Sequence, residues 1–311
     1  MIISASRRTD IPACYSDWFF RRMSEGYVLV KNPVNPHQVS RVSLSRDVVD
    51  AIVFWTKNPI PMMDRLQELK DYMYYFQFTL TGYGKDIEPN LPSKKNSLIP
   101  AFRALSRLIG KERVVWRYDP ILLTKTYSLE YHLNAFEEIA RRLCGYTDEC
   151  IISFVDSYKS IQERVKELHP MQIQEEEIHT LASAMSTCAR NNGMRLSTCS
   201  EQIDLSAYGI EHAHCIDKER LERLLGCPLS LGKGNTGRLA CGCAASVDIG
   251  AYDTCSNGCV YCYANHDTKT IQKKSSLYDP NAPLLCNIVS EHDWISERRQ
   301  KTSRNTQISF L

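Results

Sequence analysis

Short apolar runs alternate with longer amphipathic stretches along the first 200 residues of the chain. The runs carry few charges and are rich in β-branched and aromatic residues, and they cover positions 2–6, 51–55, 74–79, 114–117, 151–155 and 194–198. Strands that are buried on both faces have this pattern, because neither side of the strand meets water. The pattern therefore predicts six strands of a largely buried sheet.

Between these runs, apolar residues recur at the three- and four-residue spacing of amphipathic helices. One predicted helix follows Ser128, a suitable N-cap, and ends near Gly145; a second ends before Gly193, and a third spans about 100–108. Strand–helix alternation predicts a parallel sheet with right-handed crossovers. We expect an α/β fold with a parallel, TIM-like β/α barrel that is closed, partial or circularly permuted. An open doubly wound sheet is the alternative, although no GxGxxG sequence marks a nucleotide-binding turn.

The composition of the sequence changes after residue 226. We predict a β/α barrel over residues 1–226, with an inserted hairpin at about 27–45 around two Asn-Pro pairs. Residues 227–311 form a cysteine-rich C-terminal segment, which we expect to pack on the mouth of the barrel.

Composition and charge narrow the possible classes of protein. With 311 residues, 43% of them apolar, the chain can bury a core without disulfides. Its net charge of +2 excludes a strongly basic nucleic-acid coat, so nucleic-acid binding is open but not favoured. No apolar run approaches the ~20 residues that span a bilayer, and the N-terminus does not resemble a secretory signal. We therefore expect a cytoplasmic protein with reduced thiols and no membrane partner.

Polar residues follow the predicted strands, and in a parallel barrel the carboxyl ends of all strands meet at one mouth. The strand-end residues predicted to be catalytic are Arg7, Lys57, Arg117, Asp119 and Glu201. Their cationic members would suit a substrate with a carboxylate or phosphate group. The alternative is that ion pairs such as Arg7 with Asp10 only hold the loops in place and have no part in catalysis.

The thirteen cysteines are the most distinctive feature of the sequence, and five of them fall between positions 241 and 262. Cys255, Cys259 and Cys262 have the spacing C-x3-C-x2-C, of which scattered cysteines would produce roughly 0.02 examples by chance. Thiolates are the usual ligands of iron–sulfur clusters. A four-iron cluster held by three protein thiolates keeps one iron open to bind a small molecule. Gly258 would let this loop turn with a positive φ.

This spacing, with Tyr261 just before the last cysteine, resembles the signature of radical S-adenosylmethionine (SAM) enzymes. The string at 259–264 is similar to that of the spore photoproduct lyase branch. The whole chain also resembles the bacterial family called domain of unknown function 1848, through positions 4–10, positions 54–59 and the C-terminal cysteine segment.

The radical SAM resemblance implies a 4Fe-4S cluster on Cys255, Cys259 and Cys262, with Tyr261 beside the adenine of SAM. It implies reductive cleavage of SAM to a 5′-deoxyadenosyl radical that abstracts hydrogen from a substrate, with ferredoxin or flavodoxin as electron donor. No glycine-glycine-glutamate motif is present for the SAM amino group, which makes strand-end acids candidates, Asp10 among them.

The position of the motif departs from the resemblance. Radical SAM enzymes carry the triad in the loop after the first barrel strand, whereas only 49 residues follow Cys262 here. A circular permutation would reconcile the two if positions 246–250 formed a strand beside positions 2–6.

Further cysteines leave two alternatives open. Cys199, Cys215, Cys241 and Cys243 could bind a second cluster or a zinc ion, or be buried thiols. Zinc is also the rival at the motif, where His266 would complete a Cys3His set in a structural or nucleic-acid-interacting protein without SAM chemistry. The cysteines without ligand spacing are expected to be packing residues: Cys14, Cys144, Cys150, Cys188, Cys227 and Cys286.

Overall fold

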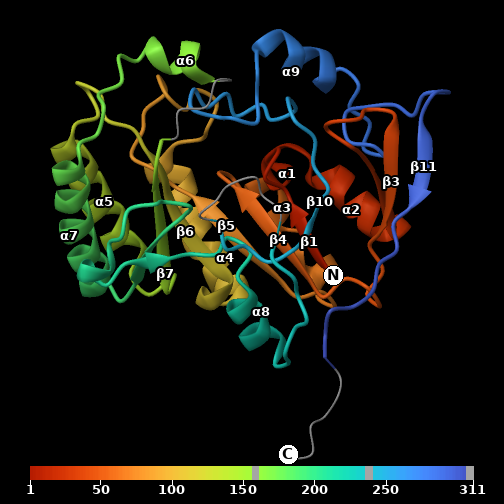
Figure 1. The fold of residues 1–311 in the computed structure, drawn as a ribbon, viewed down its shortest axis with the longest axis horizontal. Coiled ribbons are helices and arrows are strands. Elements are labelled where there is room, and N and C mark those ends of the chain that lie inside the picture. The colour runs from red at the N-terminus through yellow and green to blue at the C-terminus, as the bar shows by residue number, and fades with distance from the viewer. Residues whose placement is uncertain (156–160, 235–240, 306–311) are drawn as a thin grey trace, which may run out of the picture.

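The computed structural model describes residues 1–155, 161–234 and 241–305. Its centre is an eight-stranded sheet in the order β10-β1-β4-β5-β6-β7-β8-β9, in which every neighbouring pair is parallel (Figure 1). The strands are β1 (Ile2–Ala5), β4 (Ala51–Thr56), β5 (Tyr74–Thr79), β6 (Val114–Ile121), β7 (Glu149–Phe154), β8 (Arg195–Thr198), β9 (Glu211–His212) and β10 (Val247–Asp248). All six strands that the apolar runs predict belong to this sheet.

Nine helices lie in the described parts of the chain, and three of them were expected from the sequence. The helices are α1 (Ile11–Cys14), α2 (Ser16–Glu25), α3 (Ile60–Met63), α4 (Ile99–Ile109), α5 (Leu129–Leu143), α6 (Gln162–Lys166), α7 (Glu175–Asn191), α8 (Lys218–Leu225) and α9 (Thr268–Ser275). Turns of 3-10 helix are η1 (Leu66–Leu69), η3 (Lys111–Arg113) and η5 (Ser206–Tyr208), and η2 (Lys94–Leu98) is a turn of π-helix. Ser128 caps α5 as predicted, since its side chain accepts the N–H of Tyr131.

Both faces of the main sheet are apolar, which explains why its strands read as continuous apolar runs. Ile3, Ile52 and Trp116 belong to the large core cluster that also contains residues of α4, α5 and α7. The alternate positions Ile2 and Val53 belong to a second cluster on the opposite face. The second cluster also contains described residues between 199 and 244, so the chain after β8 covers this opposite face of the sheet.

A closed barrel would require the two end strands of the main sheet, β9 and β10, to pair with each other. In the described parts of the chain no backbone pairing joins β9 to β10, so the structure shows an α/β fold with a parallel sheet and does not show a closed barrel. The prediction of a strand beside the N-terminal strand is confirmed, because Val247 and Asp248 of β10 pair with Ile3 and Ser4 of β1.

A small second sheet lies beside α2 (Figure 1). Its strands β2 (Tyr27–Lys31) and β3 (Gln38–Ser43) form an antiparallel hairpin within the range predicted for the insertion. The third strand, β11 (Trp294–Glu297), pairs in parallel with β3 and was not expected from the sequence. Residues after 226 therefore contribute strands to both sheets, and the predicted domain boundary at 226 stays a prediction.

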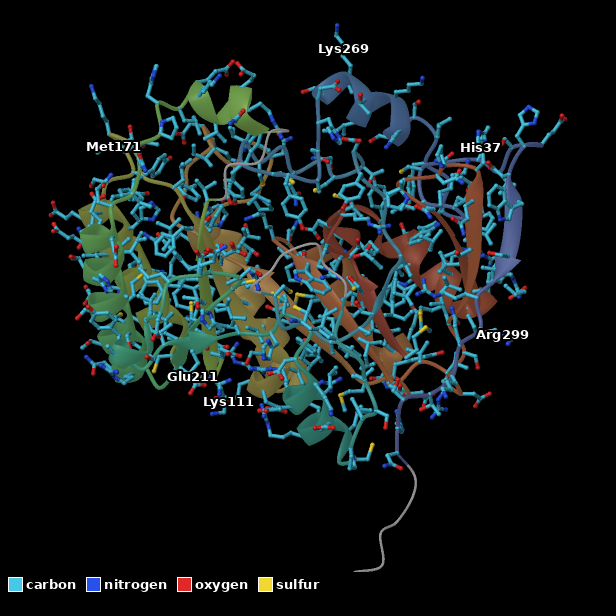
Figure 2. The ribbon with its side chains drawn as sticks, viewed as in Figure 1. His37, Lys111, Met171, Glu211, Lys269 and Arg299 are labelled. Atoms are coloured by element: carbon cyan, nitrogen blue, oxygen red, sulfur yellow. The ribbon has the colours of Figure 1, made fainter. Side chains whose placement is uncertain are left out.

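The outside of the molecule is rich in charge, as the side chains of Lys111 and Lys269 illustrate at opposite ends (Figure 2). Across residues 1–155, 161–234 and 241–305, every helix is too short or too polar to cross a membrane.

Candidate functional site

A cavity of about 560 Å³ lies at the carboxyl ends of the parallel strands. Five of the residues predicted to form the site line it: Arg7, Asp10, Lys57, Arg117 and Asp119. They come from β6 and from the loops after β1 and β4, so the parallel sheet itself brings them together.

Glu201 does not lie with them, contrary to the expectation for a strand-end residue. Ser200 lines the cavity, but its positive φ of 58° turns the backbone directly after β8. Glu201 instead accepts the N–H of Phe154 at 2.9 Å and lines a separate cavity of about 520 Å³ with His212 and His214.

The motif loop follows β10 and carries all three of its cysteines to the main cavity. Cys255, Cys259 and Cys262 line this cavity, as does Tyr261. Gly258 has a φ of 73°, which confirms the predicted turn. At Gly250 a Cβ would lie 2.1 Å from Ser6 Oγ, so only glycine lets the start of the loop approach the end of β1 this closely.

Asp10 joins three segments of the site through one buried carboxylate. It accepts hydrogen bonds from the Ala13 N–H at 3.0 Å, the Lys57 N–H at 2.7 Å and the Asn257 side chain at 3.0 Å. Burial raises the pKa of Asp10 although these donors oppose the rise. Among the described residues Asp10 forms no ion pair with Arg7, whose guanidinium lies 5.8 Å from the Trp55 ring. The carboxylate thus ties the motif loop to the loops after β1 and β4.

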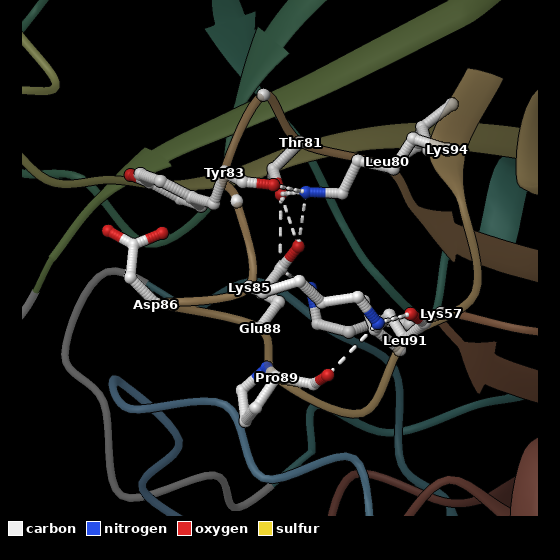
Figure 3. A network of polar contacts seen from close by, with 12 residues as sticks. Lys57, Leu80, Thr81, Tyr83, Lys85, Asp86, Glu88, Pro89, Leu91 and Lys94 are labelled. Carbon is white, nitrogen blue, oxygen red and sulfur yellow. Dashed lines mark hydrogen bonds and ion pairs between the residues drawn. The ribbon is translucent and has the colours of Figure 1, made fainter.

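Glu88 is a site residue that the sequence did not indicate. It is 1% exposed and forms ion pairs with Lys57 at 2.8 Å and Lys94 at 2.5 Å (Figure 3). It also accepts the hydroxyls of Thr81 and Tyr261. Burial opposes ionisation, but the two lysines outweigh it and lower the pKa of Glu88 to about 2. No strand-end pattern marks this position, because Glu88 lies in the long loop between β5 and η2.

Tyr261 is held firmly at the wall of the cavity. Its hydroxyl donates to Glu88, and the Lys57 Nζ lies 5.2 Å from the centre of its ring. The ring packs in an apolar cluster with Tyr83 and Cys259. The predicted position of Tyr261 beside an adenine stays a prediction.

Arg117 and Asp119 form a second buried ion pair at the cavity. The Arg117 Nε and Nη2 lie 2.9 and 2.5 Å from Asp119 Oδ2, and Ser153 donates to the other carboxylate oxygen. Burial alone would raise the pKa of Asp119, but Arg117 and Ser153 outweigh it and lower that pKa. Asp119 is therefore an anion at neutral pH and holds the guanidinium in place.

The surroundings of the motif cysteines disfavour their thiolate forms. Burial raises the pKa of Cys259 to about 12 and also raises that of Cys262. A contact with the thiol of Cys14, followed by burial, raises the pKa of Cys255. A metal would have to displace these protons, because thiolates are the ligands. Cys14 was expected only to pack, and the sequence could not relate it to Cys255 across 241 positions.

The three motif cysteines are the kind of ligand that a three-thiolate cluster requires, and all three line one cavity. The sulfurs are not gathered as ligands, however, since the described parts of the chain contain no group of three or more His, Cys, Asp or Glu arranged to hold a metal ion. Binding would therefore require the thiols to turn toward a common centre. His266, the fourth ligand of the zinc alternative, contacts Asp253 at 2.8 Å, and its side chain is 59% exposed.

The other ten cysteines differ in burial: Cys286 is buried, whereas Cys14, Cys188 and Cys227 are half-buried. The four of the predicted second site, Cys199, Cys215, Cys241 and Cys243, are buried and also line the main cavity. Cys150 is buried in the core, as expected, whereas Cys144 is exposed and so does not pack as predicted. None of the thirteen cysteines is joined in a disulfide, and all of them lie in the described ranges.

Comparison with known proteins identifies a family. Among curated proteins, nothing matches this chain. The family described as Domain of unknown function (DUF1848) matches residues 2–264, a range that contains the whole main sheet, the cavity residues named above and the three motif cysteines. Because this match covers most of the sequence, the chain belongs to the family described as Domain of unknown function (DUF1848).

Proposed function

We propose that the chain is an iron–sulfur enzyme of the radical SAM type that acts on an anionic substrate. The observation that carries this proposal is the common position of three motif thiols and several strand-end cations on one cavity. Thiols in a C-x3-C-x2-C loop are suited to three irons of a four-iron cluster. A cavity beside them has room for small molecules.

The order of the strands supports a partial, circularly permuted β/α barrel. Counted from β10, the main sheet runs β10, β1, β4, β5, β6, β7 and β8, and the motif loop follows the first strand of that series. The resemblance implies the same relation between loop and strand. The late position of the motif in the sequence then follows from where the chain starts within the barrel.

Cys255, Cys259 and Cys262 would hold the cluster, which when bound supplies the electron for reductive cleavage of SAM, received from a donor such as ferredoxin or flavodoxin. Tyr261 would offer its ring to the adenine, with its hydroxyl fixed by Glu88. The buried walls of the cavity exclude water from this chemistry.

The cations of the cavity would bind the substrate. Lys57 has three N–H donors, and the ion pair with Glu88 occupies one of them. Arg7 lines the cavity above Trp55 and offers a planar set of donors that suits carboxylate or phosphate. These side chains orient an anionic group toward the motif loop.

Anaerobic reconstitution of the full chain with iron and sulfide tests the proposal. We expect the motif cysteines to bind about four irons per chain. Adding SAM should change the spectrum of the reduced cluster, and reduction should release 5′-deoxyadenosine. Cys259→Ala should remove this iron, whereas Cys188→Ala, on α7, should retain it. Tight stoichiometric zinc on the motif, with no uptake of iron, would contradict the proposal and favour the zinc alternative.

A further inference from the structure

Four buried thiols other than those of the motif come together on the face of the main sheet that the second apolar cluster covers. Cys199, Cys215, Cys241 and Cys243 belong to one apolar cluster with Ile2, Val53 and Tyr75. Buried cysteines are often only small apolar residues. Three further observations distinguish these four from ordinary packing: their mutual contacts, the cation beside them and their positions in the sheet.

Two of the four sulfurs are in direct contact, since Cys199 Sγ lies 3.1 Å from Cys215 Sγ. Cys243 is near enough to Cys215, and Cys241 near enough to Cys243, to raise the pKa of the neighbouring thiol. Three separate segments of the chain supply them. The fold thus brings four cysteines, the number that a tetrathiolate site requires, into one apolar cluster.

Hydrogen bonds fix the backbone around these thiols. The carbonyl of Cys215 accepts the Tyr75 hydroxyl at 2.5 Å and the Gln77 amide at 3.0 Å. The N–H of Ala244 donates to the carbonyl of Ile216 at 2.9 Å, which ties the segment of Cys241 and Cys243 to that of Cys215. Ligands that stand on a fixed backbone can form a defined centre by small rotations of their side chains.

A buried cation lies against the thiols. Arg117 is 5% exposed, and its Nη1 is 3.1 Å from Cys215 Sγ. Four thiolates on a metal carry net negative charge, and a guanidinium that donates to a ligand sulfur compensates that charge. This contact comes from Nη1 of Arg117, whereas its Nε and Nη2 bind Asp119.

The positions of the thiols suggest what such a centre would do. Cys199 follows β8 and Cys215 follows β9, whereas Cys241 and Cys243 precede β10. The described residues show no backbone pairing between β9 and β10, so these ligands come from both sides of the gap in the sheet. A metal held by all four would crosslink the two edges that hydrogen bonds do not join.

We propose that Cys199, Cys215, Cys241 and Cys243 form a second, structural metal centre with thiolate ligands. Its occupant is a thiophilic metal, either a zinc ion or an iron–sulfur cluster, since both bind four cysteines. The described residues include no group of three or more ligands already arranged to hold a metal, so binding turns the four thiols toward a common centre. This proposal does not depend on the radical SAM chemistry of the motif.

The test uses the full chain with Cys255, Cys259 and Cys262 all changed to alanine, which removes the motif thiols and keeps the second set. One sample is loaded anaerobically with zinc chloride and another with iron and sulfide, and bound metal is measured by elemental analysis after desalting. We expect one zinc or one cluster per chain in the arm that matches the occupant. Adding Cys243→Ser should remove that metal, whereas adding Cys227→Ser should not.

The two arms distinguish zinc from iron–sulfur, and either result supports the centre. A folded triple variant that retains no stoichiometric metal in either arm would overturn the proposal, as would metal that Cys243→Ser leaves in place. Because the serine variant could unfold, the triple variant is also titrated with cobalt(II). A saturating tetrathiolate absorption band at one cobalt per chain supports the centre, and absence of that band counts against it.

Discussion

At the scale of single residues, Glu88 is the centre of a network of charged and polar side chains in the candidate site. Its carboxylate holds Lys57 and Lys94 and also receives the hydroxyl of Tyr261. Burial lowers the pKa of Lys94 in spite of this partner, whereas Glu88 raises the pKa of Lys57 against the effect of burial. The carboxylate therefore favours the charged form of both amines next to the motif loop.

Glu88→Gln should destabilise the protein strongly, because it leaves two buried ammonium groups without their carboxylate. Breaking a buried ion pair from one side costs about 3–5 kcal/mol, and the midpoint of urea unfolding should fall accordingly. Glu138→Gln is the matched control, since Glu138 pairs with Arg141 and Arg142 at the surface. Equal midpoints for the two variants would show that the network contributes little.

The same carboxylate predicts a pH dependence of stability. Its pKa is about 2 in the folded chain against an ordinary value of 4.5, so the unfolded state binds the proton more tightly. The stability is thus fully present above pH 4.5 and is lost as the pH falls toward 2, by about 3 kcal/mol. The difference in unfolding free energy between wild type and Glu88→Gln should shrink over this range. A constant difference would argue against the assignment.

At the scale of elements, the motif loop depends on its neighbours for position. Asp248 of β10 accepts the hydroxyls of Ser4 and Ser6 at 2.6 Å each, which anchors the start of the loop on β1. Asp10, the N-cap of α1, anchors the middle of the loop through Asn257. The geometry of the thiols thus rests on hydrogen bonds between segments that are more than 200 positions apart.

Asp10→Ala should weaken the motif centre without removing a ligand. The substitution leaves the Asn257 amide and two backbone N–H groups without their acceptor. Residues that orient metal ligands typically affect affinity by about 10–100-fold, so we expect a several-fold faster loss of motif iron to a chelator. Asp267→Ala removes the N-cap of α9 instead and is the control. If both variants lose iron equally, Asp10 has no special role.

At the scale of the whole molecule, the stability of the sheet is uneven. β5 and β6 have strands on both sides and packed apolar faces, whereas β9 and β10 are two-residue strands at its two ends. Local opening is easiest where few contacts and hydrogen bonds must break. Arg117 places one side of the site on β6, in the part of the sheet that should open least. The motif loop places the other side next to β10, at an end of the sheet that should open most easily.

Hydrogen exchange should reveal this gradient and the effect of metal. We expect the slowest exchange in β5 and β6 and the fastest strand exchange in β9 and β10. Loading with iron and sulfide should slow exchange over the described residues 241–264 and over the loop after β1, because a ligand stabilises the state that binds it. Unchanged exchange in these segments after iron uptake would place the iron elsewhere.

The sequence by itself indicated six of the eight strands of the main sheet and the turn within the motif loop. Continuous apolar runs predicted the buried parallel strands, and Ser128 and Gly258 predicted a helix cap and a turn that the structure confirms. These features depend on neighbours in the chain, and such neighbours leave a readable pattern. The spacing of Cys255, Cys259 and Cys262 is local in the same sense.

Tertiary structure alone decided which distant residues share the site. Glu88, Cys14 and β11 gave no signal, because their partners lie far along the chain and a single sequence does not record such contacts. Glu201 followed the strand-end pattern, yet one residue with positive φ turned it away from the cavity. Whether a parallel sheet closes into a barrel is likewise beyond local pattern, since it depends on how the end strands pair; here no pairing joins β9 to β10 among the described residues.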